Sequence, residues 1–144
     1  MKSIFISSDH AGYNLKEQIK KKFGKKFLFR DLGTESSKVS VNYPDYAHKL
    51  CRKVSNNSKN IGILICGSGM GMAMAANKHK KIRAALCWNE EISELAKKHN
   101  NANIISIPAR YVDNEEAIKI IEKFLKTKFE GERHLSRIKK IPCK

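Results

Sequence analysis

Short apolar runs alternate with amphipathic stretches along the whole of this chain. The runs at 4–6, 27–29, 61–66, 82–88 and 104–107 have the lengths of strands, and the third is apolar throughout, as in a parallel strand buried on both faces. Between the runs, apolar residues recur at every third or fourth position, which is the spacing of one helix face. This alternation predicts an α/β fold in which a five-stranded parallel sheet carries helices on both faces.

The length and composition of the chain fit a single domain spanning 1–144. With 144 residues, of which 41% are hydrophobic, the chain is too apolar for a disordered protein and too short for two enzyme domains. No stretch approaches the roughly 20 apolar residues of a membrane span, so we expect no membrane contact. The charged segment 130–144 is expected to form a tail with a last helix. The cysteines are scattered, which predicts reduced thiols and a cytoplasmic location: Cys51, Cys66, Cys87 and Cys143.

The formal net charge of +15 first suggests a nucleic-acid partner. Of the 29 basic residues, 23 are Lys and six are Arg, and the lysines, Lys16 and Lys20 among them, are spread over predicted helix surfaces. No helix-turn-helix, zinc-finger or aromatic RNA-binding motif accompanies them. We therefore interpret the charge as a solvated surface that helps to attract small anions, and we expect no nucleic-acid partner.

Polar residues gather directly after the predicted strands. In parallel α/β sheets, ligands bind at the carboxyl ends of the strands, so these positions are the first candidates for a site. Asp9 and His10 follow the first strand, a glycine-rich turn follows the strand at 61–66, and Arg110 follows the strand at 104–107. His99 and Asn100 end the helix before that last strand. We expect both histidines at the same sheet edge as Cys66.

Cys66 is the most informative residue, because it ends a buried strand where a helix is predicted to begin. Most cysteines are small buried hydrophobes, and Cys51 and Cys87 fit that interpretation. The backbone N–H groups of the following turn, 67–71, are suited to anions or to a developing negative oxygen. A helix N-terminus can also lower the pKa of a thiol toward neutrality, which suits a nucleophile or a base. The turn is neither a Walker A loop nor a dinucleotide fingerprint.

Two other groups of residues carry possible chemistry. Arg133 and Arg137 are one helical turn apart, so their guanidinium groups form a fork for phosphate, although a solvated basic tail is the alternative. A histidine in a loop is usually exposed to solvent, but it exchanges protons near neutral pH. His48 and His79 are expected at the surface. No ligand spacing indicates a metal site.

In combination, these residues resemble the ribose/galactose isomerase family, and within it the type B ribose-5-phosphate isomerases. The resemblance covers nearly the whole chain. It rests on the following segments, in order: Ser8-Asp9-His10-Ala11-Gly12, Tyr43-Pro44-Asp45, Cys66-Gly67-Ser68-Gly69-Met70-Gly71, Ala75-Ala76-Asn77-Lys78, Ile82-Arg83-Ala84, His99-Asn100 with Asn103, and Glu130-Gly131-Glu132-Arg133-His134 with Arg137.

The resemblance implies a Rossmann-like three-layer α/β/α sandwich that interconverts ribose 5-phosphate and ribulose 5-phosphate without a metal or an organic cofactor. Family members are dimers whose sites are completed across the subunit interface. A homodimer is therefore expected, with a dimer of dimers as an alternative assembly, and the tail at 130–144 is expected to contact the partner subunit.

The resemblance also implies a role for each site residue. Cys66 is the base that moves a proton between C2 and C1 of the sugar, and His99 is the acid that opens the furanose ring. Ser68 supplies a catalytic hydroxyl where many members carry Thr. One branch of the family uses a Glu shortly after the glycine turn, but Met72 follows the turn here, so the cysteine branch is the match. The expected substrate contacts are Asp9, His10, Tyr43, Gly67, Ser68, Gly69, Met70, Gly71, Asn100, Arg110, Arg133 and Arg137, the last two as phosphate ligands.

Three alternatives stay open at this point. An isomerase of a six-carbon sugar phosphate, such as allose 6-phosphate or galactose 6-phosphate, would use the same residues in a deeper pocket. A cysteine hydrolase could use Cys66, His99 and Asn100, but it leaves Asp9 and the arginine pair without a role. A nucleic-acid-binding protein would depend on the net charge alone.

Overall fold

The sheet of the computed structural model, which describes residues 2–144, has five parallel strands in the order β2-β1-β3-β5-β4. The expected parallel sheet is therefore confirmed. The strand predicted at 82–88 is shorter than expected, because only its middle pairs with β5 and the flanking apolar Ile82 and Cys87 fill the core from turns. The strands are β1 (Lys2–Ser8), β2 (Phe27–Asp31), β3 (Ile61–Cys66), β4 (Ala84–Leu86) and β5 (Ile104–Pro108).

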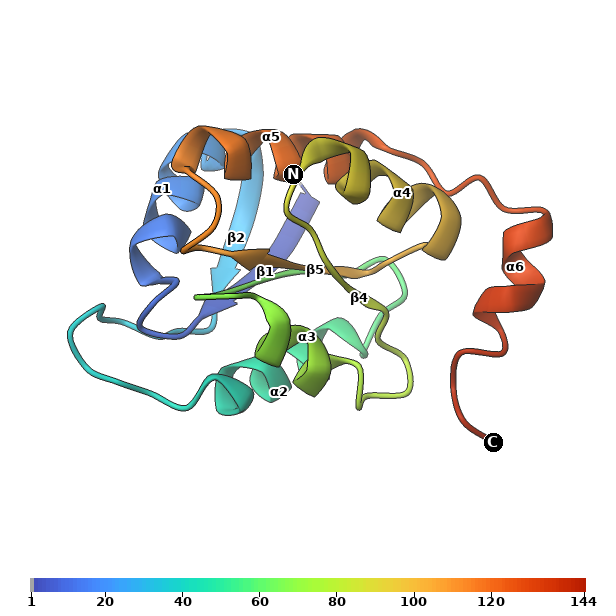
Figure 1. The fold of residues 1–144 in the computed structure, drawn as a ribbon, viewed down its shortest axis with the longest axis horizontal. Coiled ribbons are helices and arrows are strands. Elements are labelled where there is room, and N and C mark those ends of the chain that lie inside the picture. The colour runs from blue at the N-terminus through green and yellow to red at the C-terminus, as the bar shows by residue number, and fades with distance from the viewer. Residues whose placement is uncertain (1) are drawn as a thin grey trace.

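Helices cover both faces of this sheet, as Figure 1 shows, which confirms the three-layer α/β/α arrangement. One face carries α1, α4 and α5, the other carries α2 and α3, and α6 stands apart from the sheet beside the end of α4. The predicted helical tail is thus present. The helices are α1 (Tyr13–Phe23), α2 (Tyr43–Val54), α3 (Met70–Ala76), α4 (Glu90–Asn100), α5 (Asn114–Lys126) and α6 (Arg133–Ile138).

The central strand β3 is buried on both faces and divides the core into two apolar clusters. Ile61, Ile63 and Ile65 pack with the α1, α4 and α5 side, whereas Leu64 and Cys66 pack with the α2 and α3 side. This division follows from the two-residue alternation of side chains along a strand. It directs the Cys66 side chain toward the start of α3.

Lys16 on α1 is fully buried, so the expectation that it belongs to the solvated surface was wrong. Its ammonium donates to Asp31 Oδ1 (2.7 Å) and to the carbonyl oxygen of Thr34 (2.6 Å). Partial burial acts to raise the pKa of Asp31, but the ammonium groups of Lys16 and Lys20 hold it below its ordinary value. The N–H of Thr34 donates to the carbonyl oxygen of Ser8 (2.8 Å), and the N–H of Ser8 donates to that of Gly33 (2.8 Å). Lys16 therefore fixes the loop after β2 at the edge where β1 ends.

Replacing Lys16 by Met should lower the free energy of unfolding by about 2–4 kcal/mol, because it leaves a buried carbonyl without a donor and weakens the neutralisation of Asp31. Urea unfolding would measure the loss. Lys20→Met is the matched control, because Lys20 contacts the same carboxylate but is 30% exposed, and it should cost less than about 1 kcal/mol. Equal losses in the two variants would show that the buried contacts of Lys16 do not stabilise the fold.

Among the helices of residues 2–144, none is both long enough and apolar enough to cross a membrane.

Candidate active site

A hollow of about 370 Å³ opens at the carboxyl edge of the sheet, which is the edge where the strands end. The carboxyl ends of strands β1, β3 and β5 lie side by side there, as the parallel topology requires. Most of the predicted site residues before position 111 therefore share one cavity. Its lining residues are Asp9, His10, Ala11, Tyr43, Cys66, Gly67, Ser68, Gly71, Arg110 and Tyr111.

Two lining residues were missed from sequence, and two predicted ones belong to the turn without lining the hollow. Ala11 and Tyr111 are neighbours of predicted residues, but a small apolar side chain and an exposed tyrosine give no chemical signal. Gly69 and Met70 lie in the glycine turn and at the start of α3, respectively.

The Cys66 thiol lies at the floor of this hollow and is only 5% exposed. Backbone N–H groups of Met72, Gly69 and Ser68 donate toward its sulfur. Burial nevertheless raises the pKa of the Cys66 thiol above its ordinary value, and the negative charge of Asp9 acts in the same direction, so the N–H groups offset only part of the effect. The expected shift toward neutrality is therefore wrong, because desolvation outweighs the helix terminus.

This raised pKa predicts how Cys66 reacts with a neutral alkylating reagent. Because only the thiolate reacts, the rate of Cys66 modification by iodoacetamide should rise with pH through a midpoint above that of N-acetylcysteine in the same buffers. Mass spectrometry of a Cys143→Ser variant, which lacks the exposed thiol, would follow the reaction. A midpoint below that of N-acetylcysteine would contradict the dominance of burial.

The glycine turn is shaped by close contacts on both sides. Gly69 has a φ of 73°, and a Cβ there would come within 2.5 Å of the Leu86 side chain. A Cβ on Gly71 would overlap the ring of Tyr43, so this glycine admits the tyrosine to the rim of the hollow. The buried Ser106 hydroxyl donates to the carbonyl oxygen of Gly69 (2.6 Å) and ties the turn to β5.

Asp9 and His10 accept hydrogen bonds from two different segments of the chain. The buried Asp9 carboxylate accepts from the N–H of Gly12 (3.0 Å) at the start of α1. His10 Nδ1 accepts from the N–H of Val41 (3.1 Å), in the loop that leads to α2. With Nδ1 occupied as an acceptor, the neutral ring carries its proton on Nε2, which is then available to a ligand.

Arg110 supplies the positive charge of the hollow. Its backbone N–H donates to the carbonyl oxygen of Gly67 (3.0 Å), and its guanidinium lies so close to that glycine that a Cβ there would be 3.0 Å from Nη1. The hollow thus combines a buried thiol, a carboxylate, an imidazole and a guanidinium, which suits proton transfer on an anionic substrate.

His99, Asn100, Arg133 and Arg137 do not join Cys66 within one chain, so the expectation of a shared sheet edge was wrong for His99. Helix α4 runs against the strands, and its end lies at the amino edge, where the strands begin. Hydrogen bonds connect the end of α4 and the segment after it to the starts of two strands. Arg83, just before β4, donates to the carbonyl oxygen of Asn100, and the N–H of Gly62, near the start of β3, donates to that of Asn103. Cys66 is at the far end of this six-residue strand, roughly 16 Å along it.

At the amino edge, His99 forms a cluster with two residues to which sequence gave no role. The rings of His99 and His134 stack, with centroids 4.5 Å apart and planes inclined by 19°. Glu130 Oε2 lies 3.8 Å from His99 Nε2 and 3.6 Å from His134 Nε2. The i, i+4 spacing of Glu130 and His134 is the signal that could have found this pair. Arg133 Nη1 is 3.8 Å from the other carboxylate oxygen of Glu130. Arg137 lies one helical turn further along α6.

Within residues 2–144, this cluster is also the one group of three side chains close enough to share a metal ion. A metal bound by two imidazoles must lie in both ring planes, along each nitrogen lone pair. Two stacked, nearly parallel rings have no such common point between them. The observed arrangement is therefore that of a packed pair and not of a metal site.

His48 and His79 form a second pair, on the other face of the sheet. They were expected at the surface, but both are half-buried, and His48 Nδ1 lies 2.7 Å from His79 Nε2. Burial, together with the charges of His48 and Arg52, lowers the pKa of His79. The contact joins α2 to the turn after α3 and is remote from the hollow.

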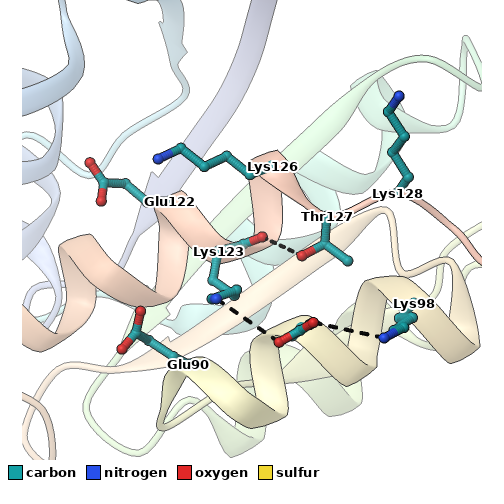
Figure 2. A pocket seen from close by; sticks show the side chains of 8 residues that line it. Glu90, Lys98, Glu122, Lys123, Lys126, Thr127 and Lys128 are labelled. Atoms are coloured by element: carbon teal, nitrogen blue, oxygen red, sulfur yellow. Dashed lines mark hydrogen bonds and ion pairs between the residues drawn. The ribbon is translucent and has the colours of Figure 1, made fainter.

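Two other hollows formed by the described residues have neither a thiol nor an imidazole among their lining side chains. One at the amino edge measures about 500 Å³ and is larger than the Cys66 hollow, but lysine, arginine, asparagine and serine side chains line it. Figure 2 shows another, between α4 and α5, where Lys98 and Lys123 both pair with Glu94. Both acidic and basic side chains line this groove, together with one threonine: Glu90, Glu94, Lys98, Glu122, Lys123, Lys126, Thr127 and Lys128.

Comparison with known proteins identifies the family. The model of the ribose/galactose isomerase family matches residues 4–141. This chain belongs to that family.

Individual members of the ribose/galactose isomerase family are similar over nearly their whole length. The probable ribose-5-phosphate isomerase B of Mycoplasma genitalium is 47% identical over 141 residues, which cover 96% of this chain and 93% of the relative. The crystal structure of the Thermotoga maritima ribose 5-phosphate isomerase is 46% identical, with a TM-score of 0.94 and coverage of 98% and 97%. The Mycoplasma genitalium structure with bound ribulose-5-phosphate has a TM-score of 0.93 at 47% identity and covers 96% of this chain and 93% of its own.

Proposed function

We propose that this enzyme interconverts ribose 5-phosphate and ribulose 5-phosphate. The observation that carries the proposal is the hollow at the carboxyl edge, where a buried thiol faces Asp9, His10 and Arg110 beneath a turn of backbone N–H groups. The family relative that holds ribulose-5-phosphate is 47% identical to this chain. The aldose–ketose reaction needs a base, an acid and support for an enediolate, and these groups supply them.

In this proposal Cys66 is the base. Its thiolate takes the proton from C2 of the open-chain aldose, and the electron pair of that bond forms the C1=C2 bond of an enediolate whose negative charge develops on O1. The O2 hydroxyl proton then passes to O1. The thiol returns its own proton to C1 while an O2 electron pair forms the ketone C=O bond, so the thiolate base is regenerated. A thiolate with a raised pKa is the stronger base toward a carbon acid, although a smaller fraction of it exists at neutral pH.

The turn at 67–71 holds the two oxygens of the enediolate. The Ser68 hydroxyl accepts from the N–H of Met70 (3.3 Å), which orients its own O–H for donation to the substrate. Asp9, His10, Tyr43 and Arg110 contact the sugar from the rim. Because Cys66 is buried among these groups, the charge develops beside fixed N–H donors.

A second copy of the chain completes the site. His99, Asn100, Arg133 and Arg137 are remote from Cys66 within one chain, so they reach the hollow from a partner subunit in a homodimer. Exposed apolar side chains support such a contact: Met70 is 54% exposed and Met74 67% exposed on α3, directly after the glycine turn. The segment 130–144 then lies against the partner, with Arg133 and Arg137 on the substrate phosphate.

The remaining alternatives have less support. A hydrolase that uses Cys66, His99 and Asn100 of one chain is not assembled, because these residues lie at opposite sheet edges. Lysines of α4 and α5 pair with glutamates, which weakens a nucleic-acid interface. The four free cysteines support a cytoplasmic location.

Initial rates on a panel of sugar phosphates, with and without a chelator, test the proposed function. Ribose 5-phosphate and ribulose 5-phosphate should be interconverted at the same rate with EDTA as without it. The values of kcat/KM for allose 6-phosphate and galactose 6-phosphate should be lower than those for the two five-carbon substrates. A higher kcat/KM for either six-carbon substrate would reassign the substrate class. Loss of activity with EDTA would overturn the metal-independent mechanism.

A further inference from the structure

The stacked pair of histidines at the amino edge is asymmetric in its exposure. The His99 side chain is 38% exposed at the end of α4, whereas the His134 side chain is 8% exposed. His134 Nε2 is buried and has no hydrogen-bond partner among residues 2–144. One ring of the pair therefore faces outward, and the other forms a surface behind it.

The backbone fixes this pair independently of the side chains. The N–H of Glu130 donates to the carbonyl oxygen of Lys98 (3.0 Å), which ties the segment before α6 to the last turn of α4. His134 N–H in turn donates to Gly131 (3.1 Å). The two rings consequently meet through main-chain contacts that involve neither imidazole.

Burial and the charged groups around the pair act on the pKa of His134. Burial lowers the pKa of His134, and the positive charges of Arg133, His99 and Arg137 act in the same direction against the opposing charge of Glu130. These groups come from α4, from α6 and from the segment between α5 and α6, the three elements that surround the ring. Burial and these positive charges therefore favour the neutral form of the His134 ring.

We propose that His134 is a positioning residue, whose buried and stacked ring holds the His99 imidazole in the orientation from which it donates a proton to the ring oxygen of the sugar. This inference rests on the proposed role of His99. In that step the His99 proton goes to the ring oxygen as the C1–O bond breaks. The O1 hydroxyl proton passes to water, which leaves the aldehyde.

The predicted phenotype depends on the shape of residue 134 and not on its nitrogens. His134→Ala removes the ring behind His99 and should lower kcat for ribose 5-phosphate by about tenfold, with KM changed less than about twofold, because misorientation of a catalytic group acts on the reacting step. His134→Phe retains a flat ring and should restore most of the lost kcat. Ribulose 5-phosphate, which has no furanose to open, should be affected less by both variants.

Three further measurements keep these outcomes distinct. The proton signal of His99 Cε1 should move downfield in His134→Ala and return toward its wild-type position in His134→Phe, because a stacked ring shields it. Ser136→Ala, on the exposed side of α6, controls for general effects on the tail. Circular dichroism and thermal unfolding identify any variant that fails to fold.

Equal loss of kcat in His134→Phe and His134→Ala would overturn the inference, since imidazole chemistry would then be required. A large rise in KM with unchanged kcat would also overturn it, because His134 would then be a substrate ligand. His99→Asn separates the inference from the proposed function. If this variant uses ribose 5-phosphate as well as wild type does, His99 does not open the ring; if it is impaired and His134→Ala is not, only the positioning role fails.

Discussion

Cys66→Ala should lower kcat for the isomerisation by about 10²- to 10⁴-fold, which is the usual contribution of a positioned general base. The hydrogen bonds of the Asp9 and His10 side chains and of the Arg110 backbone do not involve the sulfur, so sugar-phosphate affinity should be largely retained. Proton NMR in D₂O would follow hydrogen exchange at C2, and calorimetry would give the affinity. Loss of exchange together with retained binding identifies the proton-transfer step.

The other buried cysteines are the matched controls for this prediction. Cys51 and Cys87 are as buried as Cys66, and burial raises the pKa of each to about 12. Neither lines the hollow, so Cys51→Ala and Cys87→Ser should change the free energy of unfolding and leave kcat near wild type. Turnover by Cys66→Ala at the wild-type rate would remove this residue from the mechanism.

The half of the site at the carboxyl edge was predictable from sequence because strand direction alone determines it. Once 61–66 is recognised as a buried parallel strand, Cys66 and the glycine turn must lie beside the ends of β1 and β5. Asp9, His10 and Arg110 follow without any knowledge of side-chain packing. The helix cap at Asp113, which accepts from the N–H of Glu116 (2.8 Å), is local in the same way.

The misplacement of His99 has a geometric cause. Residues that follow strands share one edge, but residues that end helices lie at the opposite edge, because each helix returns the chain to the start of the next strand. His99 ends α4, and Asn103 precedes β5, so both belong to the amino edge. The same rule, applied to α4, would have placed His99 away from Cys66 within one chain.

The errors at Lys16 and Cys66 share a different cause, which is burial. Lys16 follows Leu15 on a helix with clear periodicity, and only the distant Asp31 and Thr34 make its burial possible. At Cys66 the N–H groups of the turn were foreseeable, but the extent of desolvation was not. In both cases contacts with residues distant in sequence determine how far an ionisable group is removed from water. Local sequence patterns do not predict this degree of burial.

The second large effect is the recovery of activity, at substrate concentrations well below the wild-type KM, from two impaired proteins. Arg137→Ala removes one guanidinium from the proposed phosphate site, and a lost charge-assisted hydrogen bond of about 1.5–3 kcal/mol should weaken substrate binding by about 10- to 150-fold. Arg137→Lys should recover only part, since the planar fork is lost. Lys139→Ala, two residues away at the end of α6, is the control and should change little.

The subunit that Arg137 serves is tested by mixing Arg137→Ala protein with Cys66→Ala protein and allowing the subunits to exchange. If Arg137 reaches the partner's hollow, each mixed dimer has one site that carries both lesions and one site that is intact. With equal amounts and free exchange, half of the dimers are mixed, so about a quarter of the wild-type sites should reappear. The same proteins kept from exchanging should stay near their separate activities.

The opposite arrangement gives an opposite result. If each tail serves its own chain, every site of a mixed dimer carries one lesion, and at low substrate concentration the mixture should be as impaired as its components are on average. Within one chain, the six-residue length of β3 already separates Cys66 from the amino edge, where His99 and α6 lie. A mixture without recovery would therefore require Arg137 to serve the hollow of its own chain. The distance between them is too long for its guanidinium to contact substrate there. Such a result would thereby exclude both the phosphate role of Arg137 and the composite site.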